Sequence, residues 1–229
     1  VQINMKTIFK ILSLFNKLYL KISNGNIDNY NGKFFLTRII KDKNSIFDSN
    51  NVTILKSYFN IKGSGNKILT NNNHIEKSEI VINGTNNILI LNEGTILRNT
   101  NIIIRGINNI VEIGKRTTFG GARIINVGEN NSVKIGEECL FSDKIEIWAS
   151  DTHSIYNENN EKINAEKPIV INSKVWVGSR AIILKGTEIG EGAIIGMGTI
   201  VTKDVPAKTI SVGSPNKIIK KNIHWENKY

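Results

Sequence analysis

The sequence contains one cysteine, Cys139, and three histidines among its 229 residues. A single thiol excludes an internal disulfide framework and any metal site built from a cluster of cysteines. This cysteine usage suits a reducing compartment, and we expect Cys139 to be a small buried side chain rather than a nucleophile. His74, His153 and His224 are widely separated in the sequence, which argues against a zinc site made of three histidines.

The sequence also lacks a long uncharged apolar run and any nucleic-acid-binding motif. The formal net charge of +10 lies at the two ends of the chain. Residues 1–62 hold 10 Lys and Arg against 3 acids and residues 169–229 hold 9 against 4, whereas residues 63–168 hold 11 against 13. A basic groove along the middle of the chain is therefore excluded, and we expect no nucleic-acid partner.

A helical pattern occupies residues 5–23, where apolar side chains recur at i, i+3, i+4 and i+7 and four lysines share the opposite face. These lysines exclude a transmembrane span, and the lack of a small-residue cleavage site argues against a signal peptide. We predict an amphipathic α-helix with two roles left open. It packs on the rest of the protein or on a neighbouring subunit, or it contacts the inner face of a bacterial plasma membrane. Residues 24–58 are rich in Asn, Gly and Lys, and we predict that they form a connector with one or two strands. The helix and the connector together make up an N-terminal unit of residues 1–58.

Six consecutive hexads fill residues 171–206. A repeat of six residues fits neither an α-helix nor a coiled coil, but it fits a flat three-sided coil in which each side is one short strand. One aliphatic residue of each hexad would point inward and a small residue would fit near the corner, so that stacked coils form a parallel β-helix. The inward positions are Ile171, Val177, Ile183, Ile189, Ile195 and Val201, and the small or β-branched positions are Val175, Ala181, Thr187, Ala193, Thr199 and Val205.

A longer repeat of 22 residues precedes the hexads. Gly84, Gly106 and Gly128 each begin a Gly-x-Asn-Asn motif, and each repeat unit would be one coil with this motif at a corner, because Gly and Asn accept the left-handed conformation. We expect the Asn side chains to form a structural ladder rather than a ligand site, and we assign residues 59–210 to the β-helix. The same spacing aligns Leu91 with Ile113 and Ile135, and Leu97 with Phe119 and Phe141.

Two segments depart from the repeat. Residues 148–168 form a polar loop without periodicity that contains His153, and a loop of this length inside a regular solenoid usually carries function. We therefore predict a catalytic loop here. Residues 211–229 leave the solenoid through Gly213 as a basic tail, and Pro215 suits the first position of a short α-helix that would close the open end of the stack.

These motifs together resemble the hexapeptide-repeat O-acetyltransferases. The resemblance rests on SDTHSIYN in the loop, WVGS and IGMGTIVTKD in the hexads, and GSPNKIIK in the tail. It is to galactoside, maltose and nodulation-factor acetyltransferases and, in the loop, to bacterial capsule and polysialic acid O-acetyltransferases. The strong likeness covers about residues 120–221, whereas residues 1–118 resemble the family only in their general pattern. It implies a left-handed β-helix, a homotrimer, acetyl-CoA as donor, and active sites between adjacent subunits.

The resemblance also implies roles for individual residues. His153 matches the catalytic base and Trp176 the aromatic residue that lines the site. Met197 stands where smaller residues are common, and both tail positions are Lys where some relatives have Arg, which would loosen recognition of phosphate. The residues that match coenzyme-binding positions are Trp176, Gly178 and Gly196, Ser179 and Met197 toward the pantetheine arm, Thr202 and Lys203 near the nucleotide, and Lys217 and Lys220 at the phosphates.

Transfer of acetyl from a thioester to a sugar hydroxyl needs a base, alignment of the two groups, and donors for the charge on the carbonyl oxygen. Histidine titrates near neutrality, so His153 could take the hydroxyl proton and return it to the departing thiolate without a covalent enzyme intermediate. Asp151 could orient the imidazole, although a backbone carbonyl could do the same. Trp148 and Tyr156 are candidate stacking surfaces for a sugar ring, with ordinary packing as the alternative.

We therefore predict a cytoplasmic acetyl-CoA-dependent O-acetyltransferase, without a metal ion, that modifies a saccharide of a capsule, O-antigen or similar surface glycan. The alternatives are a sugar N-acetyltransferase, an acyltransferase with another donor, a non-catalytic hexapeptide scaffold, and a zinc enzyme of the kind that binds metal across a subunit interface. The coenzyme motifs argue against a scaffold, and the wide spacing of the histidines argues against zinc.

Overall fold

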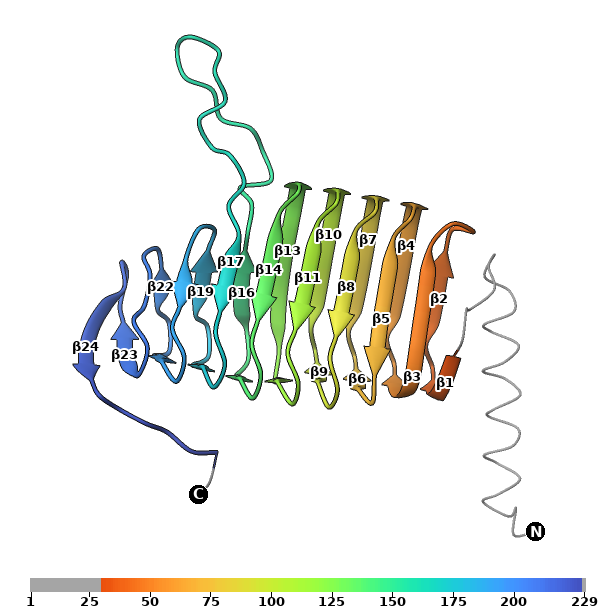
Figure 1. The fold of residues 1–229 in the computed structure, drawn as a ribbon, viewed down its shortest axis with the longest axis horizontal. Helices are drawn as coiled ribbons and strands as arrows, with labels where there is room; N and C mark the ends of the chain where they lie inside the picture. The colour runs from red at the N-terminus through yellow and green to blue at the C-terminus, as the bar shows by residue number, and fades with distance from the viewer. Residues whose placement is uncertain (1–29, 228–229) are drawn as a thin grey trace.

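The computed structural model describes residues 30–227 (Figure 1). These residues form strands, turns and loops and contain no helix. The amphipathic helix predicted over residues 5–23 lies outside the described residues, as does its contact with a membrane or with other parts of the protein. Between residues 30 and 227, therefore, no helix could reach across a membrane.

The strands wind into a three-sided parallel β-helix, with each coil running from the second face to the third and then to the first. The first face contains β2 (Arg38–Lys41), β4 (Tyr58–Ser64), β7 (Glu79–Thr85), β10 (Asn101–Ile107), β13 (Ala122–Glu129), β16 (Ile145–Trp148), β19 (Ile182–Leu184) and β22 (Ile200–Val201). The second contains β5 (Lys67–Asn71), β8 (Ile88–Leu91), β11 (Ile110–Ile113), β14 (Ser132–Ile135), β17 (Ile169–Ile171) and β20 (Glu188–Ile189). The third contains β6 (His74–Glu76), β9 (Ile96–Arg98), β12 (Thr118–Phe119), β15 (Leu140–Phe141), β18 (Trp176–Val177), β21 (Ile194–Ile195), β23 (Thr209–Val212) and β24 (Lys217–Lys221).

One long strand joins two of these faces. β3 (Ile46–Leu55) pairs with β5 through its first half and with β6 through its second half. Between the halves Asn51 has a φ of 49°, the left-handed conformation that turns a coil corner. β1 (Tyr30–Phe35) pairs in parallel with β3. The parallel β-helix is therefore established by the strand pairing, and its left-handed winding stays a prediction.

The pairing register confirms both repeat lengths. On the first face Glu79 pairs with Asn101 and Asn101 with Arg123, so each of these coils takes 22 residues. Beyond the loop Ile171 pairs with Ile189, so the coils of the hexad region take 18. Each inward side chain therefore lies directly above its counterpart in the preceding coil.

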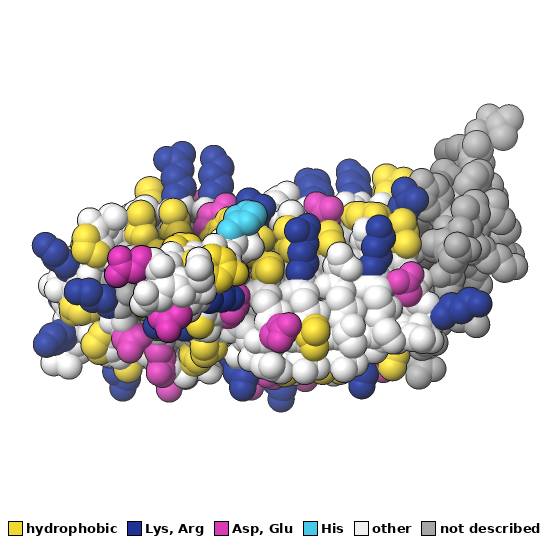
Figure 2. Space-filling model, turned by 90° about the horizontal axis from the view of Figure 1, so that it is seen from above, with side chains coloured by type: hydrophobic (Ala, Val, Ile, Leu, Met, Phe, Trp, Pro, Cys, Tyr) yellow, Lys and Arg dark blue, Asp and Glu magenta, His cyan; other side chains and the backbone are white. Residues whose placement is uncertain are grey.

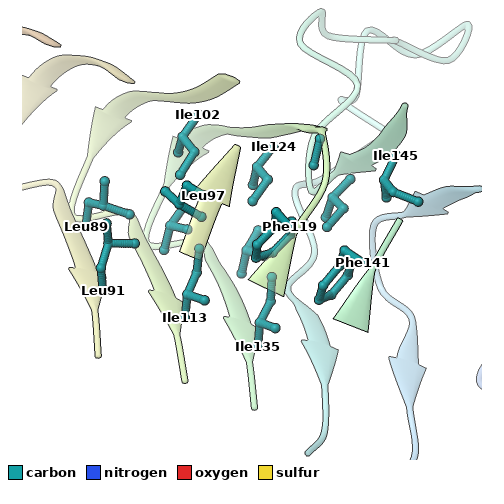
Figure 3. Packing of buried hydrophobic residues seen from close by; sticks show 14 of the residues in the cluster. Leu89, Leu91, Leu97, Ile102, Ile113, Phe119, Ile124, Ile135, Phe141 and Ile145 are labelled. Atoms are coloured by element: carbon teal, nitrogen blue, oxygen red, sulfur yellow. The ribbon is translucent and has the colours of Figure 1, made fainter. Parts of the chain in front are cut away.

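The inward side chains form one continuous hydrophobic core (Figure 3). The six aliphatic hexad positions are all buried, as are the six small or β-branched positions, so both predicted sets are confirmed. Phe119 and Phe141, which the 22-residue repeat aligns, stack with ring centroids 4.2 Å apart and planes 10° apart. Each fully buried Ile, Leu or Phe contributes about 1.5–3 kcal/mol through the apolar surface it removes from water.

Buried asparagines hold successive corners together. Asn109 accepts a hydrogen bond from the backbone N–H of Asn131 at 3.0 Å, and its side-chain amide donates to the carbonyl of Gly128 at 2.7 Å. Asn87 makes the same two bonds one coil earlier, at 3.0 and 2.9 Å. Asn108, which precedes Asn109 in the sequence, has a φ of 55° and turns the corner. The predicted structural ladder is confirmed, because these amides satisfy backbone groups that would otherwise be buried without partners.

The coils begin within the segment predicted to be a connector. β1, β2 and β3 all lie between residues 24 and 58, and they pair in parallel with later strands. Phe47, Val52 and Ile54 from this segment are buried in the common core. The sheets therefore run through residue 59 without a break, because apolar side chains alternate with the polar ones that made this segment look like a linker.

The predicted C-terminal helix is wrong. Residues Lys217–Lys221 form β24, which pairs antiparallel with β23. As the last parallel strand of the third face, β23 would otherwise expose a row of unpaired backbone groups. β24 pairs with that row, and its exposed lysines discourage the addition of another strand. The end of the stack is therefore closed by a strand.

The buried thiol gives a direct test of the core. Cys139 is 2% exposed, and burial raises the pKa of its thiol to about 11. At pH 8 the fraction of reactive thiolate should be about a hundredfold lower than for a thiol with the ordinary pKa of 9.0. We expect a disulfide-exchange reagent to leave the native protein unmodified over an hour and to find one thiol per chain in guanidinium chloride. Rapid reaction of the native protein would contradict this packing.

Candidate active site

The loop predicted to be catalytic leaves the solenoid at the edge between the first and second faces. It separates β16 from β17 and projects beyond the coils (Figure 1). Near the tip its two arms pair, because Tyr156 and Lys162 form an antiparallel bridge and the Ile163 N–H donates to the Ile155 carbonyl at 2.9 Å. In the view onto this edge, Lys and Arg side chains are spread along both long sides of the solenoid instead of lining one groove (Figure 2).

His153 lies in the first arm of the loop and is exposed. Its backbone is held on both sides, because its N–H donates to the Asp151 carbonyl at 2.7 Å and its carbonyl accepts from the Asn164 amide at 2.8 Å. Thr152, just before it, has a φ of 62°, so the chain turns sharply here. An exposed imidazole on a fixed backbone suits a group that exchanges a proton with a bound molecule.

The carboxylate of Asp151 binds two residues other than His153. Its Oδ2 atom accepts from Lys185 Nζ at 2.6 Å and from Asn164 Nδ2 at 2.8 Å. The hydrogen bond from Lys185, with a smaller contribution from Asn164, lowers the pKa of the Asp151 carboxyl below its ordinary value. The predicted contact between this carboxylate and the imidazole of His153 is not seen among the described residues, and Asp151 instead fastens the base of the loop.

Trp176 lies on a different face from the loop. It stands on β18 of the third face with 38% of its surface exposed. Trp225, from the C-terminal tail, packs against it with ring centroids 5.9 Å apart and planes 48° apart. The indole N–H of Trp225 donates to the Lys174 carbonyl at 2.9 Å. The tail therefore turns back along the coils and adds a second aromatic ring beside Trp176 (Figure 1).

Four of the predicted coenzyme-contacting residues lie at the edge between the third and first faces. Gly178 and Ser179 follow β18, and Gly196 and Met197 follow β21 one coil later. A Cβ at Gly178 would lie 2.7 Å from the backbone nitrogen of Met197, so the close stacking of these corners requires glycine. The Ser179 hydroxyl donates to the Asp143 carboxylate and lowers its pKa. Met197 is 72% exposed and stands on this narrow strip of backbone.

The residues predicted near the nucleotide and phosphates are divided between two places. Thr202 and Lys203 follow β22 at the same edge as the loop, and their backbone N–H groups donate to the side-chain oxygen of Asn216 at 3.0 and 3.2 Å. These donors are therefore already bonded within the chain. Lys217 and Lys220 lie on β24 and are exposed on the third face.

The two candidate sugar-stacking residues have different surroundings. The indole N–H of Trp148 donates to the Glu146 carboxylate at 2.7 Å, and the Arg123 guanidinium lies over its ring at 5.1 Å from the centroid. Trp148 is thus packed by its own chain on the first face. Tyr156, in contrast, is 59% exposed in the projecting loop.

A single chain does not bring the predicted site residues together. His153, Asp151, Thr202 and Lys203 lie at the edge between the first and second faces. Trp176 lies on the third face, and Gly178, Ser179, Gly196 and Met197 lie at its edge with the first face. The width of the first face separates the two groups.

One cavity lies at the edge between the second and third faces. It has a volume of about 470 Å³ and opens beside β20, where Glu188, Glu191 and Asp204 contribute to its lining together with Asn172 and Pro206. None of the predicted site residues lines it. Across residues 30–227, no three His, Cys, Asp or Glu side chains are grouped as the ligands of a metal ion would be.

The sequence analysis missed several residues that shape the site. For Lys185 the repeat held a signal, because Leu184 pairs with Trp148, and the residue after Leu184 therefore lies beneath the exit of the loop. For Trp225 there was none, since the periodicity ends before the tail. Asn164 bonds His153, 11 positions away, and Asp143 bonds Ser179, 36 positions away. Asn216 bonds two residues 14 and 13 positions away, and all these bonds lie in irregular corners.

Comparisons with known proteins place this fold in context. A family profile described as bacterial transferase hexapeptide (six repeats) matches residues 168–203. The polysialic acid O-acetyltransferase of Escherichia coli O1:K1 / APEC is 41% identical over 88 residues, which are 38% of this chain and 29% of that protein. Matches to the curated relatives span about a third of their length, from 29% to 36%.

Two solved structures are similar over most of the chain. The polysialic acid O-acetyltransferase OatWY superposes with a TM-score of 0.68 at 27% identity, covering 88% of this chain and 93% of that one. The polySia-specific acetyltransferase NeuO superposes with a TM-score of 0.70 at 30% identity, covering 89% of both chains. Because this identity extends through nearly the whole solenoid and the six-repeat profile lies within it, the chain belongs to the hexapeptide-repeat acetyltransferase family.

Proposed function

We propose that this protein transfers an acetyl group from acetyl-CoA to a hydroxyl group of a saccharide, with His153 as the general base. The observation that carries the proposal is His153 itself, exposed on a loop whose backbone is bonded on both sides of it. The likeness to two polysialic acid O-acetyltransferases over most of the chain supports a polymeric surface glycan as the acceptor.

The edge between the third and first faces fits an extended coenzyme. At Gly198, which has a φ of 70°, an added Cβ would meet no atom within 4 Å, so the backbone of this corner is open to an approaching molecule. Met197 beside it offers an apolar surface, and Lys217 and Lys220 offer exposed positive charge for phosphate groups. Bound there, acetyl-CoA supplies the activated acyl group.

The chain's own residues would then handle the proton. His153 accepts it from the acceptor hydroxyl as that oxygen attacks the thioester carbonyl, and gives it to the departing thiolate. One C–O bond forms and one C–S bond breaks, so a single imidazole balances the reaction. The N–H groups of Trp176 and Gly178 already donate to carbonyls of the next coil, at 3.0 and 2.8 Å, so the backbone N–H of Ser179 is the proposed donor to the carbonyl oxygen. For Asp151 we propose an indirect role through the base of the loop.

Assembly into a homotrimer would bring the two groups of residues together. One chain carries His153 at one edge of its first face, together with Thr202 and Lys203, and carries Ser179 and Met197 at the other edge. A neighbouring copy could set its edge with Met197 against the loop of the first. We therefore propose that the active site is shared between subunits. The predicted cytoplasmic location agrees with the use of acetyl-CoA.

Release of free thiol from acetyl-CoA tests the proposal. We expect release to depend on an added saccharide, within a panel that includes polysialic acid and amino-sugar polymers. The product should lose its acetyl group in mild alkali, because esters hydrolyse there and amides do not. An alkali-stable product would indicate N-acetylation. If no saccharide stimulates release and the protein binds no coenzyme A, the scaffold alternative holds instead.

A further inference from the structure

A cluster at the base of the loop involves a lysine from the next coil. Lys185 follows β19 immediately, and β19 pairs with β16, the strand from which the loop departs. Its ammonium lies 2.6 Å from Asp151 Oδ2, 3.1 Å from the Asn164 carbonyl and 3.0 Å from the Ala165 carbonyl. The side chain is only 18% exposed, so these three bonds are partly shielded from water. Lys185 therefore connects both arms of the loop to the rigid solenoid.

Asn164 carries this connection to His153. Its amide nitrogen donates to Asp151 Oδ2 and to the His153 carbonyl, both at 2.8 Å. Its side-chain oxygen accepts from the backbone N–H of Ile155 at 2.7 Å. The position of His153 is thus fixed from the second arm, and both Asn164 and Asp151 are held in turn by Lys185.

The remaining ion pair of the loop differs from this cluster. Lys162 bonds Glu166 at 2.9 Å, four residues along the same arm, with side chains 37% and 26% exposed. Such a local, solvent-exposed pair contributes little to the stability of the loop. The Lys162 ammonium bonds a carboxylate of its own arm, whereas the Glu166 side chain also lies against Gly128 of the coils. Lys185, in the solenoid, therefore bonds both arms of the loop, whereas Lys162, in the loop, pairs with a carboxylate of its own arm and provides a matched control.

We propose that Lys185 is a positioning residue, which holds His153 at the place of reaction through Asp151 and Asn164. The inference rests on the proposed role of His153 as the base. A general base must lie within hydrogen-bond distance of the proton it takes, and a displacement of about 1 Å can cost roughly a hundredfold in rate. A loop that projects from the coils needs an anchor of this kind, because the short bridge near its tip joins its two arms to each other and not to the solenoid.

The test compares Lys185→Met with Lys162→Met. Both variants keep the aliphatic chain and lose one charge, but only the first removes the anchor. We expect a glutamyl endopeptidase to cut the Lys185→Met loop after Glu158, which is not next to either substituted residue, roughly tenfold faster than in wild type, because cleavage follows the population of opened loop. Lys162→Met should be cleaved within about twofold of wild type, as a weak exposed pair implies. An unchanged cleavage rate for Lys185→Met would overturn the anchor.

Kinetics then separate positioning from stability. In Lys185→Met, kcat should fall roughly tenfold to a hundredfold while KM for acetyl-CoA stays unchanged, because the partners of Lys185, which are Asp151, Asn164 and Ala165, are not predicted coenzyme contacts. Lys185→Arg should recover part of the loss, since it keeps the charge. Asp151→Asn is the second variant, and it should show the same accelerated cleavage without touching the solenoid.

The outcomes distinguish this inference from the proposed function. An active wild type together with a Lys185→Met variant of unchanged kcat would overturn the positioning role alone. A wild type that releases no thiol with any saccharide would overturn the proposed function and the positioning role with it. Faster cleavage together with lower kcat and unchanged KM would support both.

Discussion

Replacing His153 with alanine is expected to lower turnover of acetyl-CoA and saccharide by at least roughly a hundredfold, the scale of the loss of a general base. The imidazole is exposed, and the hydrogen bonds at this residue use its backbone, so the variant should keep the loop and the coils intact. Release of free thiol under saturating acetyl-CoA measures the effect. The melting temperature and the oligomeric state, by light scattering, should match those of wild type.

A second histidine provides the control for this experiment. His74 lies on β6 of the third face, 3.8 Å from Glu76 and several coils away from the loop. His74→Ala removes the same side chain from the same fold and should leave turnover unchanged. If His153→Ala retained turnover within about threefold of wild type, a base contributing the expected factor could not be this residue.

The largest expected loss of stability follows from adding one methyl group at a corner. Gly106 has a φ of 113°, and a Cβ there would collide with the carbonyl of Gly128 in the next coil, with its carbon 2.9 Å away. The same carbonyl accepts the hydrogen bond from Asn109, so relieving the collision breaks the asparagine ladder. Gly106→Ala should therefore lower the free energy of unfolding by roughly 4 kcal/mol or more, because backbone strain, a clash and a lost buried hydrogen bond add together.

Gly198→Ala separates strain from collision. Gly198 has a φ of 70°, but an added Cβ would meet no atom within 4 Å. This variant should cost only about 1 kcal/mol, the penalty of a left-handed alanine. In a chain of this size that corresponds to about 2–4 °C in melting temperature, against roughly 10 °C or more for Gly106→Ala. Similar melting temperatures for the two variants would contradict the close stacking at the Gly-x-Asn-Asn corners.

The repeat itself could be predicted because its physical causes are local and periodic. A side chain at Ile171 or Ile189 points inward for the same reason as at every sixth position between them, and each coil rests on the one before it. The Asn-Asn pairs at residues 108–109 and 130–131 likewise predicted the corners of the coils, since Asn is among the few residues that tolerate a positive φ. His153 stood out as the histidine within the interruption of this pattern.

Contacts between non-repeating segments depended on the tertiary structure. Only the exposed edge of β23 explains why Lys217–Lys221 forms a strand, because a proline and a run of lysines favour a helix start when read alone. The Asp151 carboxylate accepts a hydrogen bond from Lys185, 34 positions later, instead of bonding the imidazole of His153, two positions away. Sequence spacing determined which residues face inward and stack, whereas the winding of the coils decided which outward residues meet. Inward order follows from a fixed period, but outward contacts join corners and tails whose positions no period specifies.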